Sequence, residues 1–71
     1  MLQFDIATEY IKLDSLLKAV NAVGSGGEAK IVIADGMVLV NGETELRRGR
    51  KLYSGDRVAY DGNVFLVEKE S

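Results

Sequence analysis

The stretch LDSLLKAVNAVGSGGEAKIVIADG, Leu13–Gly36, holds two helical patterns that are joined by a glycine-containing turn. In its first half apolar residues recur at i, i+3, i+4 and i+7, which predicts a helix with one buried face formed by Leu13, Leu16, Leu17 and Val20. Gly24 is expected to end this helix in the left-handed conformation. The following SGGE predicts a capping box, in which the Ser25 hydroxyl accepts from the Glu28 N–H and the Glu28 carboxylate reaches back. With Gly36 closing the second helix, the stretch predicts a helix-turn-helix-like pair.

Strand patterns lie on both sides of this helix pair. Residues 2–6, LQFDI, alternate apolar and polar side chains, as a half-buried strand does. After the helices, Asn41-Gly42 and Asp61-Gly62 each predict a two-residue hairpin turn, and residues 54–56 suit another tight turn. The order of elements predicts an α+β fold in which two short helices pack on a small antiparallel sheet. We expect residues 1–71 to form a single domain.

The composition argues against several classes of protein. The 71 residues include no Cys and no His, so disulfides, thiolate metal sites and the commonest general base are missing. The first residues lack the pattern of a signal peptide, and no apolar stretch reaches the ~20 residues that span a bilayer. There is neither a P-loop nor a dinucleotide-binding fingerprint, and an enzyme would depend on Asp14, Asp56 and the lysines. We therefore expect a cytoplasmic, non-catalytic protein with no cofactor, no metal and no small-molecule substrate.

Almost half of the cations lie in the segment RRGRK, Arg47–Lys51. The formal net charge is −2, and outside this segment the remaining five of the nine Lys and Arg face eleven Asp and Glu. One interpretation is a solvated loop that balances Glu43, Glu45 and Asp56. The other is a contact surface for phosphates, because RNA affinity depends on clustered Lys and Arg, and one guanidinium can bind two phosphate oxygens. The density of charge favours the second interpretation.

Four blocks of the sequence together resemble the RNA-binding domain named after ribosomal protein S-four. KLDSLL, residues 12–17, looks like its R-L-D-x-x-L opening, and Ser25 with residues 29–33 is similar to its S-R-x-x-A-x-x-x-I second helix. GMVLVNG, residues 36–42, matches its G-x-V-x-V-N-G strand and turn, and GDRV, residues 55–58, matches the start of its later strand. The combination of SGGEAK with RRGRKLYSGD looks closer still to the small stand-alone bacterial members, the YaaA type.

This resemblance implies binding of structured RNA, with ribosomal RNA during large-subunit maturation as the expected case. In the family, the RNA surface is formed by the two helices, the turn between them and the neighbouring hairpin. Carried over residue by residue, the resemblance implies RNA contacts from Lys12, Ser25, Gly26, Gly27 and Lys30. Gly26 stands where the family usually has Arg, so one cation of the family's pattern is missing.

Charge and resemblance together predict an RNA site with two walls on one contiguous face. The basic wall consists of Arg47, Arg48, Arg50 and Lys51. The helical wall consists of Lys12, Lys18 and Lys30. Each of these three lysines, taken singly, is better explained as a solvated helix residue, and only as a group near one face do they indicate a site. The alternative function is a protein-interaction adaptor in which RRGRK contacts an acidic partner.

Two features leave further alternatives open. Gly26-Gly27 could bind a phosphate at the start of the second helix, or form only a tight interhelical turn, since Glu28 in the first turn would repel an anion. The three tyrosines, Tyr10, Tyr53 and Tyr60, could stack on bases. A small core needs large aromatic side chains, however, so we expect Tyr53 and Tyr60 to lie in the core.

Overall fold

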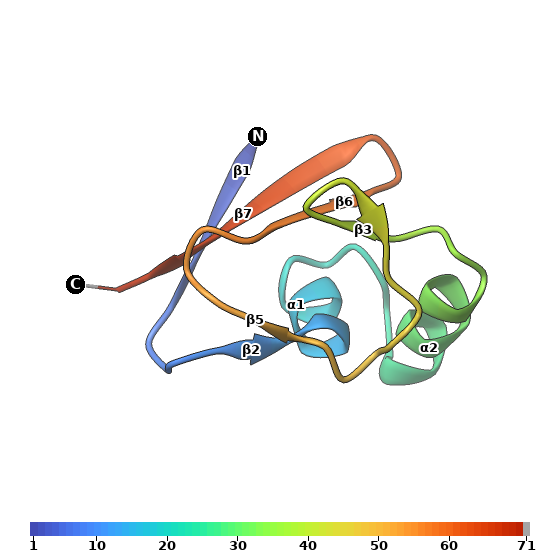
Figure 1. The fold of residues 1–71 in the computed structure, drawn as a ribbon. Coiled ribbons are helices and arrows are strands. Elements are labelled where there is room, and N and C mark those ends of the chain that lie inside the picture. Colours follow the sequence, from blue (N-terminus) through green and yellow to red (C-terminus); the bar gives the residue numbers. More distant parts are fainter. Residues whose placement is uncertain (71) are drawn as a thin grey trace.

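The chain folds into two layers, with two helices packed on one face of a five-stranded sheet (Figure 1). This computed structural model describes residues 1–70. Its elements, in chain order, are β1 (Leu2–Ile6), β2 (Ile11–Lys12), α1 (Leu13–Ala19), α2 (Gly26–Ala34), β3 (Leu39–Val40), β4 (Glu43–Thr44), β5 (Lys51–Leu52), β6 (Arg57–Tyr60) and β7 (Asn63–Lys69). The predicted α+β architecture with two short helices is confirmed. Within residues 1–70, neither helix has the length and apolar character that crossing a membrane requires.

The sheet is mixed. Its strand order is β1-β7-β6-β3-β4, while β2 and β5 pair in a separate two-stranded ribbon. β1 runs parallel to β7, with Leu2 beside Phe65 and Ile6 beside Lys69, whereas the other pairs are antiparallel. The prediction of an antiparallel sheet was therefore wrong for this one pair. Parallel strands need a long connection, and here both helices and all the intervening strands provide it.

One core joins the helices to the inner face of the sheet. From the helices, the residues that face the sheet are fully or almost fully buried: Leu13, Leu16, Leu17, Ala29, Val32 and Ile33. The strands contribute alternate residues, because successive side chains of a strand point to opposite faces; these are Val40, Val58, Phe65 and Val67. Leu52 of β5 is also fully buried, so the β2–β5 ribbon is attached to the same core.

α1 ends earlier than the sequence pattern predicts. Asn21 adopts the left-handed conformation with φ 60°, and the N–H groups of Asn21 and Ala22 donate back to carbonyls in the last turn of α1. The prediction that Gly24 ends this helix was wrong, because the chain has to leave the helix in time to bury Val23 in the core. Asn tolerates this conformation better than most residues. Gly36, with φ 77°, ends α2 as predicted.

Both predicted hairpin turns are present. Asn41 and Gly42 have φ values of 52° and 85°, and Asp61 and Gly62 have values of 50° and 80°. Two successive positive φ values define the hairpin turn that suits the right-handed twist of a strand pair. The turns join β3 to β4 and β6 to β7.

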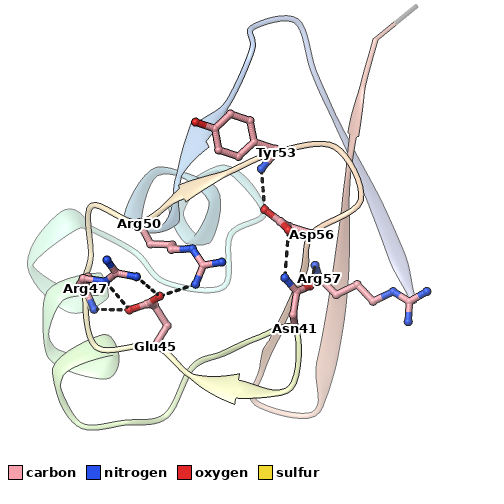
Figure 2. A network of polar contacts seen from close by, with 7 residues as sticks. All are labelled: Asn41, Glu45, Arg47, Arg50, Tyr53, Asp56 and Arg57. Atoms are coloured by element: carbon pink, nitrogen blue, oxygen red, sulfur yellow. Dashed lines mark hydrogen bonds and ion pairs between the residues drawn. The ribbon is translucent and has the colours of Figure 1, made fainter.

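The side chain of Asn41 connects its hairpin to the turn before β6. Its amide nitrogen donates to Asp56 Oδ1 at 3.1 Å, and its amide oxygen accepts from the Arg57 N–H at 2.9 Å. Asp56 Oδ2 in turn accepts from the Tyr53 N–H at 2.8 Å (Figure 2). The predicted tight turn at residues 54–56 is therefore fixed in place by side chains as well as by its backbone.

Candidate nucleic-acid interface

The basic loop, Arg47–Lys51, is held against the start of α1 by its backbone. The Leu13 N–H donates to the Arg50 carbonyl at 2.9 Å, and the Asp14 N–H donates to the Arg48 carbonyl at 3.1 Å. The first N–H groups of any helix lack partners within the helix, and Lys12 provides no side-chain cap here. The loop carbonyls fill that role, which leaves the side chains of the loop free for other contacts.

A buried carboxylate organises the same loop from the other side. Glu45 is only 7% exposed and accepts four hydrogen bonds. Arg47 donates its backbone N–H, Nε and Nη2 at 3.0–3.2 Å, and Arg50 donates Nη1 at 2.7 Å (Figure 2). The hydrogen bonds from Arg47 and then Arg50 lower the pKa of Glu45 from 4.5 to about 2, although burial alone would raise it. The same pairing raises the pKa of Arg47.

From the sequence, Glu45 was interpreted only as a charge that balances the loop, and its structural role was missed. The hairpin turn at Asn41-Gly42 was the sequence signal that could have revealed this role. Counting outward from Asn41-Gly42 places Glu45 opposite Val38, and the Glu45 N–H indeed donates to the Val38 carbonyl at 3.0 Å. Because Val38 is fully buried, its cross-strand neighbour also faces inward.

Glu45 anchors the basic loop without neutralising it. The loop carries four cations against this one carboxylate, and Glu43 and Asp56 form no ion pair with it in the part of the chain that the structure describes. The Arg47 side chain remains 74% exposed although it is bound to Glu45. Arg48 and Lys51 are exposed as well. A shallow, open hollow of about 490 Å³ lies among Arg47, Gly49, Arg50 and Lys51, so cationic side chains line a surface that an anion can reach.

Strand pairing brings one residue of the helical wall to the basic loop. Lys12 of β2 lies directly opposite Lys51 of β5. Like charges in directly opposed positions destabilise a strand pair, and an anion between them would relieve the repulsion. The ammonium group of Lys51 lies 4.9 Å from the centre of the Tyr10 ring, which offsets part of this cost.

Lys18 and Lys30, unlike Lys12, have no residue of the basic loop as a direct pairing partner. Lys18 is in the last turn of α1 and Lys30 is in α2, and both are exposed. Figures 1 and 2 both show the basic loop running beside the two helices. Within residues 1–70, no ion pair or hydrogen bond joins either lysine to that loop. Their membership of one contiguous face with the loop stays a prediction.

The N-terminus of α2 already has a negative partner. The Ser25 hydroxyl accepts from the Glu28 N–H at 3.2 Å, as predicted. The Glu28 carboxylate reaches back to the Gly24 N–H at 2.6 Å, one residue before the position that a standard capping box uses. An anion beside Gly26 and Gly27 would meet this charge, which favours the interhelical-turn interpretation of these two glycines.

The tyrosines divide between core and surface. Tyr60 is half-buried and packs against the core, as predicted. Tyr53 is 45% exposed, so the prediction that it lies in the core was wrong. The turn at residues 53–56 directs its ring away from the sheet and toward β2, where it meets Tyr10.

Comparison with known proteins gives consistent matches. The sequence profile of the S4 domain family matches residues 4–68. A Bacillus subtilis relative named "Probable ribosome maturation protein RlbA" is 49% identical over 57 residues, which is 80% of this chain and 80% of the relative. Escherichia coli YbcJ is 39% identical over 58 residues, which is 82% of this chain and 83% of the relative.

The solution structure of Escherichia coli YbcJ resembles this fold over almost its whole length. The TM-score is 0.73 at 35% identity, and the match covers 96% of this chain and 87% of that chain. That structure is described as revealing an αL motif involved in RNA binding. The two-helix arrangement on a sheet is thus shared with a structure in which RNA binding has been assigned to this motif.

Proposed function

The chain belongs to the S4 domain family, an RNA-binding family, and from this premise we propose that it binds structured ribosomal RNA during maturation of the large ribosomal subunit. The name of the Bacillus subtilis relative, a ribosome maturation protein, supports the choice of ribosomal RNA. The proposed role is binding without catalysis, and it would be carried out in the cytoplasm.

One observation carries the proposal: the basic loop is fixed by backbone bonds and by Glu45, while Arg47, Arg48 and Lys51 remain exposed. RNA phosphates are bound best by cations whose positions are set before binding, because less side-chain freedom is then lost. The Arg47 side chain uses Nε and Nη2 for Glu45 and is still mostly exposed to solvent. Arg48 and Lys51 are held only through their backbone and the neighbouring ring, and so are free to meet phosphates.

The proposed site combines this basic wall with the helical wall. Its members are Lys12, Lys18, Ser25, Gly26, Gly27, Lys30, Arg47, Arg48, Arg50 and Lys51. Lys12 and Lys51 form the junction between the walls, since they are cross-strand neighbours. A double-stranded RNA hides its base edges in a narrow groove, so a rigid basic surface of this kind would recognise the shape and the phosphates of a folded RNA.

Binding to fragments of ribosomal RNA, measured by fluorescence anisotropy at several salt concentrations, tests the proposal. If four phosphates are contacted, log affinity should fall against log salt with a slope near ~ −3. Changing Arg47, Arg48, Arg50 and Lys51 to Ala should abolish most of that slope. Since Arg47 and Arg50 also hold Glu45, the cleaner variant is Arg48→Ala with Lys51→Ala, which should flatten the slope by about 1.5.

The matched control removes the same charge elsewhere. Arg57 and Lys69 lie on β6 and β7, outside the basic loop, and Lys69 is paired with Glu9. Arg57→Ala with Lys69→Ala should leave the slope unchanged. If both double variants bind like the wild type, or if the wild type binds RNA only weakly at low salt, the proposal fails. The basic loop would then be better explained as a contact for an acidic protein partner.

A further inference from the structure

The β2–β5 ribbon has one outward face made of two tyrosines and two lysines. Ile11 pairs with Leu52 and Lys12 pairs with Lys51, so the same register places Tyr10 opposite Tyr53. Alternate residues of a strand share a face. Leu52 is fully buried and Ile11 packs against the core, and therefore the other four residues point outward. We call Tyr10, Lys12, Lys51 and Tyr53 the tyrosine–lysine face.

The two rings lie together, with Tyr10 half-buried and Tyr53 exposed. Their centroids are 6.0 Å apart and their planes are inclined by 49°, and the Lys51 ammonium lies 4.9 Å from the centre of the Tyr10 ring. Tyr53 keeps 45% of its surface exposed. A pair that served only to fill the core would bury both rings. Here almost half of Tyr53 stays in water, beside a second ring that carries the Lys51 ammonium.

Hydrogen bonds fix the backbone of both tyrosines in the tyrosine–lysine face. The Tyr53 N–H donates to Asp56 Oδ2 at 2.8 Å, and the Asp56 N–H donates to the Tyr53 carbonyl at 3.0 Å. On the other strand, the Thr8 hydroxyl donates to the Tyr10 carbonyl at 2.8 Å. Both backbone positions are therefore set before any ligand arrives, which reduces the entropy lost on binding.

We propose that the Tyr10–Tyr53 pair stacks an unpaired base of the RNA while Lys12, Lys51 and the basic loop hold the adjoining phosphates. This inference rests on the proposed function, which it makes more specific. Base stacking on aromatic side chains accepts any base, because each base presents a flat π surface. The preferred ligand is consequently a helical RNA with a bulged or looped-out nucleotide, and an uninterrupted duplex should bind less well.

Charge decides between a nucleotide and a peptide as the occupant. The face is continuous with the basic loop through Lys51, and the hollow of about 490 Å³ lined by the loop begins at the same residue. No carboxylate forms an ion pair with Lys12 or Lys51 in residues 1–70. A polyanion that carries flat rings can stack on the tyrosines and pair with the lysines at the same time.

Two synthetic RNA hairpins test the inference, identical except for a single unpaired adenosine in the stem of one. The wild type should bind the bulged hairpin about tenfold more tightly, in line with the loss per base when a stacking aromatic is removed. Tyr53→Leu should bind both hairpins equally, with the affinity and salt slope that the wild type shows for the uninterrupted hairpin. Tyr53→Phe keeps the ring and should keep the preference.

A spectroscopic measurement separates stacking from an indirect structural effect. The chain has no Trp, so Tyr53→Trp introduces a single indole at the proposed stacking position. Its fluorescence should be quenched by the bulged hairpin and much less by the uninterrupted one. Tyr60→Trp, at a residue that packs against the core, should respond equally to both hairpins.

The possible failures are distinguishable. Equal binding of both hairpins by the wild type, or a preference that survives Tyr53→Leu, would overturn the stacking inference and leave the proposed function standing. Absence of salt-dependent binding to either hairpin and to ribosomal RNA fragments would overturn both. Circular dichroism of each variant shows whether it is folded. If Tyr53→Leu does not fold, the fluorescence of Tyr53→Trp decides, because equal quenching by the two hairpins would also overturn the inference.

Discussion

The two helices begin in different ways. α2 carries its own cap: the Ser25 hydroxyl accepts from the backbone of Glu28, and the Glu28 side chain returns to Gly24. α1 has no side-chain cap at Lys12, and its first two N–H groups are bound by carbonyls of the basic loop. The same physical need, partners for the free N–H groups of a helix start, is met locally in one helix and by a distant segment in the other.

This difference shows how the basic loop can be ordered without losing its cations. Its backbone is attached to α1 and its inner side chains are attached to Glu45, so the exposed charges sit on a frame that α1 helps to define. Substitutions in α1 or at Glu45 should therefore disturb the basic loop, whereas substitutions at the start of α2 should not. The following predictions test that contrast, in order of expected effect.

Removing the first core residue of α1 should have the largest effect. Leu13 is fully buried, and Leu13→Ala should lower the free energy of unfolding by about 3 kcal/mol, through lost burial and the cavity left behind. Urea unfolding followed by circular dichroism measures the change. The control is Ile31→Ala on the exposed side of α2, where Ile31 is 61% exposed; a loss there as large as that at Leu13 would contradict the assignment of the core.

Removing the charge of Glu45 should loosen the loop and the start of α1 together. Glu45→Gln should cost about 1–3 kcal/mol at pH 7, because hydrogen bonds from two arginines lose their charged acceptor. Hydrogen exchange at the amides of Leu13 and Asp14 should become faster. Glu43→Gln is the control, since Glu43 is exposed on β4; unchanged exchange in Glu45→Gln would break the proposed link.

The same carboxylate should make stability depend on pH. The pKa of Glu45 is lowered from 4.5 to about 2 in the folded protein, so its contribution is present above pH 4.5 and is lost as the pH falls toward 2. Denaturation curves between pH 5 and pH 2 should therefore show the wild type losing stability more steeply than Glu45→Gln. Parallel curves for the two proteins would exclude the ion pairs described here as the cause.

Removing the cap of α2 should have a smaller and strictly local effect. Ser25→Ala should cost about 1 kcal/mol, the usual loss for such a cap. The amides of Leu13 and Asp14 should exchange as in the wild type. Ser15→Ala, in the first turn of α1, controls for the loss of a serine hydroxyl that caps no helix. Combined with Glu45→Gln, Ser25→Ala should give additive losses within about 0.5 kcal/mol, and a larger coupling would show that the two helix starts are not independent.

Restoring the cation that the family usually carries should have the smallest effect. An added Cβ at Gly26 meets no atom within 4 Å, so Gly26→Arg should fold normally. Affinity for ribosomal RNA fragments should rise about three- to fivefold, with the salt slope steeper by ~0.7–0.9 for one new phosphate contact. Gly26→Ala controls for the change in helix propensity and should leave the slope as it is. An unchanged slope in Gly26→Arg would remove the start of α2 from the RNA surface.

Features that depend on neighbouring residues were predictable from the sequence. The hairpins at Asn41-Gly42 and Asp61-Gly62, the Ser25 cap and the end of α2 at Gly36 all follow from local backbone preferences, and all were confirmed. The family resemblance was confirmed as well, because its motifs are spread over the length that the S4 domain profile matches.

Features that depend on how irregular segments fold back on themselves were missed. Glu45 looked like one more surface charge, although its position opposite Val38 was a signal that it faces inward. The hydrogen bonds from Arg47 and Arg50 depend on the path of the loop after β4, which the sequence pattern does not give. Tyr53 was expected in the core, yet the hydrogen bonds of Asp56 turn its ring outward to meet Tyr10. Which proposed site residues touch RNA also depends on the partner and stays a prediction.

The parallel pair of β1 and β7 has a consequence for the kinetics of folding. Leu2 and Phe65 are neighbours although nearly the whole chain separates them, and contacts of this kind are slow to form because a long loop has to close first. During synthesis β1 is made first and pairs last. Until β7 is available, β1 has no strand to pair with, and nothing holds its apolar residues Phe4 and Ile6 against the core. We expect the helix pair and its hairpin to form early, and the docking of β1 to limit the rate at which the complete fold appears.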